Sequence, residues 1–154
     1  MMILMKLFFR AFRATRMREI TATSDLVGTA VLYTRLVNMG MGVLRERDRS
    51  LNPIIRTSIR KEVTSDCLSA MQRFLEGGAY QNLENLLTIC ESITWFSERD
   101  HAVKDLHRLK LELHRGNKNG VEMKAKDWLN LCKEKGWNQE KTLAARVLSA
   151  YNSC

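Results

Sequence analysis

Apolar residues recur at helical spacing along most of the chain, and the clearest run begins at Pro53. Asn52 can cap a helix there, and proline fits the first helical position. Gly77 and Gly78 follow the run, as expected just beyond a helix end. The pattern therefore predicts a helix from Pro53 to about Glu76. Its apolar stripe comprises Ile55, Ile59, Val63, Cys67 or Ala70, Met71 and Phe74.

Four further helical patterns follow, with short polar or glycine-bearing turns between them. One runs from about Tyr80 to Phe96, and Ser97 with Asp100 then resembles a capping box, with Asp in the place of the usual Glu or Gln. Later turn or start signals stand at Gly116, Gly120, Gly136 and Asn138. No convincing strand pattern occurs. The sequence predicts an all-α protein, a compact bundle of six or seven helices with short connections.

A long apolar segment, residues 26–44, precedes these helices. Its length would suit a membrane span, but Arg35 near its middle and three glycines disfavour that interpretation. A largely buried helix that bends or ends near Gly40 and Gly42 fits the pattern better, because glycine weakens helix interiors.

The first eighteen residues hold five basic residues and no acidic one. On a helical wheel, Lys6, Arg10, Arg13 and Arg16 fall on one side, and Phe9 lies at the border. The opposite side carries Ile3, Leu4, Met5, Leu7, Phe8, Ala11 and Phe12. Such a basic amphipathic helix has three interpretations: a helix that docks on a membrane surface or a partner, a mitochondrial presequence, or a first helix packed on the domain behind it. The docking candidates are Phe8, Phe9, Arg10, Phe12, Arg13 and Arg16.

The chain has 154 residues, which suits one domain with a real core. We predict a basic amphipathic helix over residues 1–20 and a single helical domain over residues 21–154. The net charge is +8, and residues 1–62 carry twelve Lys/Arg against five Asp/Glu, whereas the rest of the chain is nearly balanced. This asymmetry indicates that the N-terminal half faces nucleic acid or an anionic membrane, unless the charge only keeps exposed helix faces soluble.

A basic surface for nucleic acid is expected across the junction that precedes the helix at Pro53. Its members are Arg45, Arg47, Arg49, Arg56, Arg60 and Lys61. Arginine forks suit phosphates, and no helix-turn-helix, zinc-finger or aromatic-rich signature is present, so any binding would read the backbone rather than the base sequence. The alternative is a solvated, salt-bridged face.

Catalytic and metal-binding patterns are weak in this sequence. His107 and His114 share one helix face, but no ligand at the right spacing completes a metal site, so we expect solvent-exposed histidines, no metal and no cofactor. The cysteines lack a CxxC pair and predict reduced thiols in an intracellular protein, three of them in apolar stripes and Cys154 exposed. We therefore expect that the protein is not an enzyme.

The opening sequence MMILMKLFFRAFR resembles the starts of paramyxovirus C-type accessory proteins, which also lead with a short hydrophobic-basic stretch. The resemblance extends to size, basicity and a helical C-terminal half. It implies a non-enzymatic regulator of host antiviral signalling and viral RNA synthesis that associates with membranes through its N-terminus. It carries no individual functional residues over to this chain.

The sequence favours a non-enzymatic regulatory or accessory protein that acts through protein–protein contacts, with its N-terminal helix docked on a membrane or a partner. One alternative is an RNA-binding protein that uses residues 45–61, and another is a mitochondrial helical protein with a cleaved presequence. The expected location is intracellular, cytoplasmic or membrane-peripheral, with mitochondria as the alternative. The expected partner is an unidentified protein, with RNA, an anionic membrane surface and a second copy of the chain as further candidates.

Overall fold

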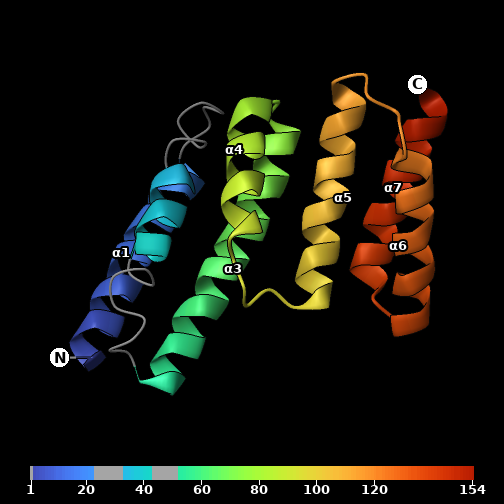
Figure 1. Cartoon of the computed structure of the whole chain (residues 1–154). Helices are drawn as coiled ribbons and strands as arrows, with labels where there is room; N and C mark the ends of the chain where they lie inside the picture. Colours follow the sequence, from blue (N-terminus) through green and yellow to red (C-terminus); the bar gives the residue numbers. More distant parts are fainter. Residues whose placement is uncertain (1, 23–32, 43–51) are drawn as a thin grey trace. The chain divides into compact units, whose positions relative to one another are not determined.

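The computed structural model describes residues 2–22, 33–42 and 52–154, with side chains from residue 9 to residue 19 in the first of these ranges (Figure 1). All regular structure in these ranges is helical, and no strand occurs in them. The helices are α1 (Met2–Ala22), α3 (Pro53–Glu76), α4 (Tyr80–Glu91), α5 (Glu98–His114), α6 (Val121–Lys135) and α7 (Asn138–Ser153), and residues 33–42 are helical as well. The predicted all-α fold with six or seven helices is confirmed.

The chain divides into two compact units, Met1–Leu86 and Leu87–Cys154. Within the first unit, α1 packs on α3 (Figure 1). The expected boundary between residues 20 and 21 stays a prediction.

In the first unit, α3 begins and ends where its sequence signals stand. The side chain of Asn52 accepts a hydrogen bond from the Ile54 backbone N–H at 2.8 Å, and Pro53 occupies the first turn. The N–H of Gly77 closes the other end on the carbonyl of Arg73 at 2.9 Å. The predicted limits of this helix are confirmed. Its buried apolar residues are Ile59, Val63, Cys67, Ala70, Met71, Phe74 and Leu75.

The helical residues 33–42 pack against α3 in the same unit. The ring of Tyr33 meets the ring of Phe74 edge-on, with 6.3 Å between centroids. Leu36, Val37 and Gly40 are buried, while Arg35 is exposed. The expected helix is present in the part of residues 26–44 that the structure describes, but it is buried on one side only, at Tyr33, Leu36, Val37 and Gly40. No helix in the described ranges is long and apolar enough to cross a membrane.

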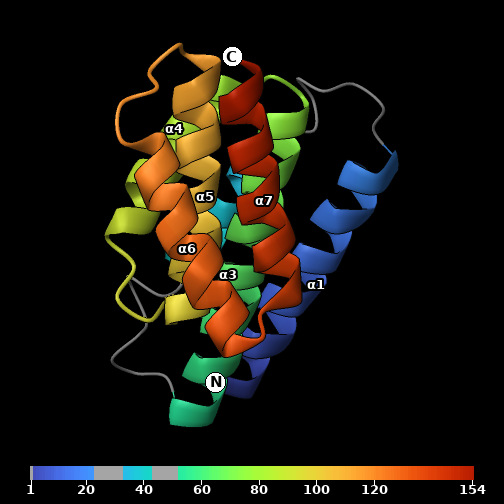
Figure 2. The ribbon, with the colours of Figure 1, turned by 90° about the vertical axis from the view of Figure 1, so that its right-hand side faces the viewer.

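In the second unit, α5, α6 and α7 pack on one another around a single apolar core (Figure 2). The core residues are Leu106, Leu109, Leu113, Val121, Ala125, Ala144 and Val147. The capping box at α5 is confirmed, because Ser97 Oγ accepts from the Asp100 N–H at 3.1 Å and an Asp100 carboxylate oxygen accepts from the Ser97 N–H at 3.0 Å. Left-handed glycines, Gly120 and Gly136, flank α6.

Two local predictions of helix limits are corrected. The helix that starts at Tyr80 ends at Glu91 rather than near Phe96, because the N–H groups of Ser92 and Ile93 turn back to the carbonyls of Ile89 and Cys90. Ile93 and Phe96 are still buried, so their apolar pattern indicated burial and not helix. The final helix begins at Asn138 itself, with Trp137 as the capping residue and no side-chain cap.

Candidate functional site

The contact between α1 and α3 contains half of the predicted docking residues. Phe9, which the helical wheel placed at the border of the apolar side, is the most deeply buried of them, with 1% of its surface exposed. It lies against Gly40, where an added Cβ would stand 3.6 Å from the Phe9 ring and 2.6 Å from Cγ2 of Val63. That spacing is tighter than carbon atoms tolerate. The glycine therefore allows Phe9, Val63 and the helix at residues 33–42 to approach one another closely.

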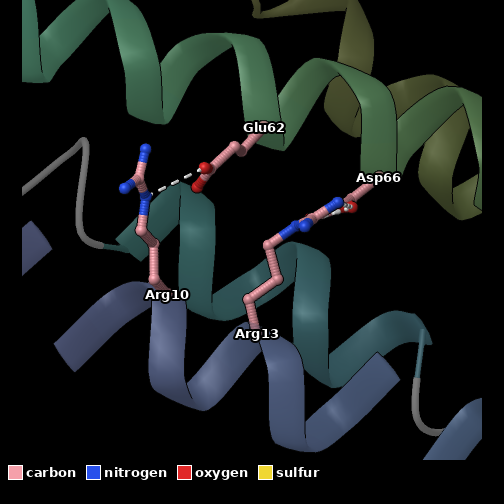
Figure 3. Close-up of polar contacts among 4 residues, drawn as sticks. All are labelled: Arg10, Arg13, Glu62 and Asp66. Carbon is pink, nitrogen blue, oxygen red and sulfur yellow. Dashed lines mark hydrogen bonds and ion pairs between the residues drawn. The ribbon is translucent and has the colours of Figure 1, made fainter. Parts of the chain in front are cut away.

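Beside this apolar contact, Arg13 binds Asp66 of α3 through three hydrogen bonds (Figure 3). Its Nε donates to the two carboxylate oxygens at 3.1 and 2.9 Å, and its Nη2 donates to Oδ1 at 2.6 Å. Only 4% of the Asp66 side chain is exposed. The hydrogen bonds with Asp66 raise the pKa of Arg13 above its ordinary value, against the opposing effect of burial. The Arg13 guanidinium is therefore charged at neutral pH.

A second, weaker pair extends the same side of α1. Arg10 Nε lies 3.4 Å from Glu62 Oε1, one helical turn before Asp66 on α3 (Figure 3). About half of the Arg10 side chain is exposed, so water screens this pair more than the Arg13–Asp66 pair. The two arginines nevertheless point in one direction. The basic side of α1 thus faces α3 at these positions.

Arg16 and Phe12 interact within α1. Arg16 Nη1 donates to Glu19 at 2.7 Å, and its guanidinium lies 4.8 Å from the centre of the Phe12 ring. Both residues are half-buried. Phe8 belongs to α1, but its side chain is outside the described part of the structure. Among residues 9–19 of α1, whose side chains the structure describes, the exposed ones are Arg10, Ala11, Ala14, Thr15 and Arg18.

The predicted nucleic-acid surface is only partly described. Arg45, Arg47 and Arg49 lie outside the described residues. Arg56 and Arg60 are half-buried on α3, and Lys61 is exposed. A single basic surface across residues 45–61 stays a prediction.

The second unit contains two polar arrangements that the sequence analysis did not single out. Arg99 Nε donates to Glu140 at 2.9 Å, and the Glu140 side chain is only 8% exposed. Burial and the nearby Glu140 charge raise the pKa of the Cys132 thiol, which makes it a poor nucleophile. An open cleft lies elsewhere, at the start of α6, and is lined partly by Lys118, Lys126 and Tyr151. No local motif marks either arrangement, because each joins residues far apart in the sequence.

The histidine and cysteine predictions have mixed outcomes. His107 is buried and its Nδ1 lies 2.8 Å from the carbonyl of Val103, so the expectation that all three histidines face solvent is wrong. Cys67, Cys90 and Cys132 are buried and Cys154 is exposed, as predicted. Within residues 2–22, 33–42 and 52–154, no three His, Cys, Asp or Glu side chains gather as a metal site would require.

The chain matches no protein-family model, no curated protein and no solved structure at a significant level.

Proposed function

We propose that this chain is a non-enzymatic regulatory protein that acts through protein–protein contacts, with α1 as its docking helix. The observation that supports this most is the orientation of α1. Arg13 and Arg10 hold carboxylates of α3, so the basic side of the helix is engaged inside the first unit. The opposite side, with Ala11, Ala14 and Thr15, is exposed.

This orientation changes the roles of the predicted docking residues. Phe9 and Arg13 hold α1 on α3, because one is buried and the other bonds a buried carboxylate. We assign docking instead to the exposed side of the helix. On that side Ala11, Ala14 and Thr15 lie between the longer Arg10 and Arg18, and these short side chains lose little conformational entropy and let another backbone come close. A partner helix fits such a strip.

A protein partner is favoured over an anionic membrane by the state of the arginines. A helix that lies in a lipid headgroup layer uses free cations and bulky apolar anchors on opposite sides. Here Arg10, Arg13 and Arg16 each hold a carboxylate of the chain itself. Drawing them to lipid would break the Arg13–Asp66 pair and leave a buried carboxylate without its partner.

The test is a large charged residue on the docking side of the full chain. Ala14→Arg places it at an exposed position of α1, and Ala145→Arg is the matched control at an exposed alanine of α7. Both variants and the parent chain are cross-linked in the source cells and purified. We expect a defined set of proteins to accompany the parent chain and Ala145→Arg, and to fall about tenfold with Ala14→Arg, the equivalent of about 1.4 kcal/mol.

Equal recovery of these proteins with both variants would refute α1 as the docking helix. Two further measurements address the alternatives. Retention of the chain on phosphatidylserine vesicles or on single-stranded RNA at physiological salt, with loss at high salt, would replace the protein partner by a membrane or by RNA. Mass spectrometry of the mature protein tests the alternative of a cleaved mitochondrial presequence, because a docking helix must remain attached after any processing.

A further inference from the structure

An open cleft of about 450 Å³ lies on the C-terminal unit, where the turn after α5, the start of α6 and the end of α7 meet. It is lined by Lys118, Gly120, Glu122, Met123, Lys126 and Tyr151. The function proposed for α1 does not involve this cleft.

Lys118 is the link between the turn and α7. Its ammonium group lies 4.7 Å from the centre of the Tyr151 ring and donates a hydrogen bond to the backbone carbonyl of Cys154 at 3.3 Å. The cation therefore covers the aromatic ring. It remains close enough to solvent to meet an incoming anion, because the residue is exposed.

On the other side of the cleft, Lys126 and Glu122 form a pair one turn apart on α6, with 2.6 Å between Nζ and Oε1. The hydrogen bond with Lys126 lowers the pKa of Glu122 and raises that of Lys126, so both are charged at neutral pH. The Lys126 side chain is 58% exposed and the Glu122 side chain 44%, and a pair that is this open to solvent exchanges partners at little cost. An incoming carboxylate can share Lys126.

The surroundings of the cleft are basic. From residue 115 to residue 126 the chain has four Lys/Arg and a single acid, which gives a local charge of +3. The basic residues are Arg115, Lys118, Lys124 and Lys126, and the acid is Glu122. Such a patch attracts acidic ligands over a distance of about 10 Å at moderate salt.

Met123 adds an apolar element among these charges. It is 71% exposed, and in the described parts of the chain Ile54 is the only other large apolar residue that is exposed. A thioether side chain is flexible and polarisable, so it adapts to differently shaped apolar partners. Because Met123 is exposed, it does not contribute to the buried core.

From these observations we propose that the cleft binds an acidic peptide segment of another protein. The carboxylates of the segment pair with Lys118 and Lys126, and an aliphatic or aromatic side chain next to them packs on Met123. Charge complementarity and the exposed thioether together select this occupant. A nucleic acid fits less well, because Lys118 already covers the Tyr151 ring on which a base would stack, and phosphates make no use of Met123.

The experiment uses the full chain and a fluorescently labelled peptide in which Asp and Glu alternate with Leu and Phe. Met123→Ala and Lys126→Gln change the cleft, and Lys133→Gln is the control at an exposed lysine farther along α6. We expect anisotropy to show saturable binding that weakens about fivefold to tenfold with each cleft variant and stays unchanged in the control. Amide shifts in the bound chain should centre on residues 118–126 and Tyr151.

Three outcomes would overturn the proposal. They are absence of saturable binding, equal binding of a peptide with Lys in place of the acids, and a Met123→Ala variant that binds like the control. The last result, combined with tighter binding of single-stranded RNA, would identify a simple anion site instead. Ala14→Arg must leave the peptide affinity unchanged, so a failure here and a failure of the α1 proposal are separate results. Because Met123 is exposed, thermal melting should confirm that its variant is folded.

Discussion

The contact between α1 and α3 and the core of α5, α6 and α7 hold helices together in different ways. The first combines one buried phenylalanine with two arginine–carboxylate pairs. The second is an apolar cluster that draws on all three helices. Apolar burial is non-directional and scales with area, whereas a bidentate arginine–carboxylate pair fixes one orientation. The difference indicates that the contact between α1 and α3 determines how α1 is oriented on α3 more than it determines how tightly α1 is held there.

Leu106→Ala should have the largest effect on stability, because it removes most of a fully buried side chain from the apolar cluster. We expect a loss of about 3 kcal/mol in the free energy of unfolding of the C-terminal unit, from lost burial and the cavity left behind. Urea unfolding of the full chain, followed by amide exchange in α5–α7, measures it. The half-buried Leu129 is the control, and its change to Ala should cost about 1 kcal/mol. Equal losses at the two sites would contradict a single apolar core.

Arg13→Ala should lower the free energy of unfolding almost as much as Leu106→Ala, although only one ion pair is removed. It leaves the Asp66 carboxylate, with a 4% exposed side chain, without its partner, at a cost of about 3 kcal/mol. Amide exchange should show the loss in α1 and α3 while α7 stays protected. Arg10→Ala is the matched control at an exposed pair and should cost less than about 1 kcal/mol. Equal losses of stability in the two variants would show that the orientation of α1 does not depend on the Arg13–Asp66 pair.

Gly40→Ala tests the close approach at Phe9. Alanine favours helix by about 1 kcal/mol over glycine, but here its Cβ would stand 2.6 Å from Val63. We expect the clash to exceed the gain, with a net loss of about 1–2 kcal/mol in stability. At Gly42 nothing lies within 4 Å of an added Cβ, so Gly42→Ala should stabilise. Adding Val63→Ala to Gly40→Ala should relieve part of the loss, which a double-mutant cycle would detect.

Ser97→Ala should have the smallest effect of the four. It removes one half of the capping box at the start of α5 and exposes a helix-end donor, at a cost of about 1 kcal/mol. Thermal unfolding of the full chain measures it. Asp100→Ala should lose a similar amount, because its carboxylate forms the reciprocal bond. A larger loss in either variant would indicate that this end of α5 has contacts beyond its cap.

Local signals in the sequence predicted much of the fold. The limits of α3 could be predicted because their signals lie close to the helix ends in the sequence. Asn52 and the proline after it mark the start, and the glycines mark the end. The Ser97–Asp100 box is local in the same sense. The limit at Glu91 was missed because Ile93 and Phe96 continue the apolar pattern after the helix has ended. Burial and helical structure are separate properties there.

The candidate sites depend on pairings across the chain, which local patterns do not contain. Arg13 and Asp66 are 53 residues apart. An arginine on an amphipathic helix therefore indicates a charged side but not whether it meets solvent, lipid or a carboxylate. His107 was misjudged for a related reason, since a histidine on a helix rich in charged residues can still be buried. The cleft at Tyr151 likewise needs α6 and α7 to be side by side.

The distance between Arg13 and Asp66 along the chain also has a consequence in time. During synthesis α1 emerges before α3, and 53 residues must be added after Arg13 before its carboxylate partner exists. At ordinary rates of translation this takes about 3–10 s. For that interval the arginines and Phe9 have no α3 to bind, and the helix meets its surroundings as a free basic amphipathic segment. A factor that recognises nascent chains would encounter a different surface from the one the folded protein presents.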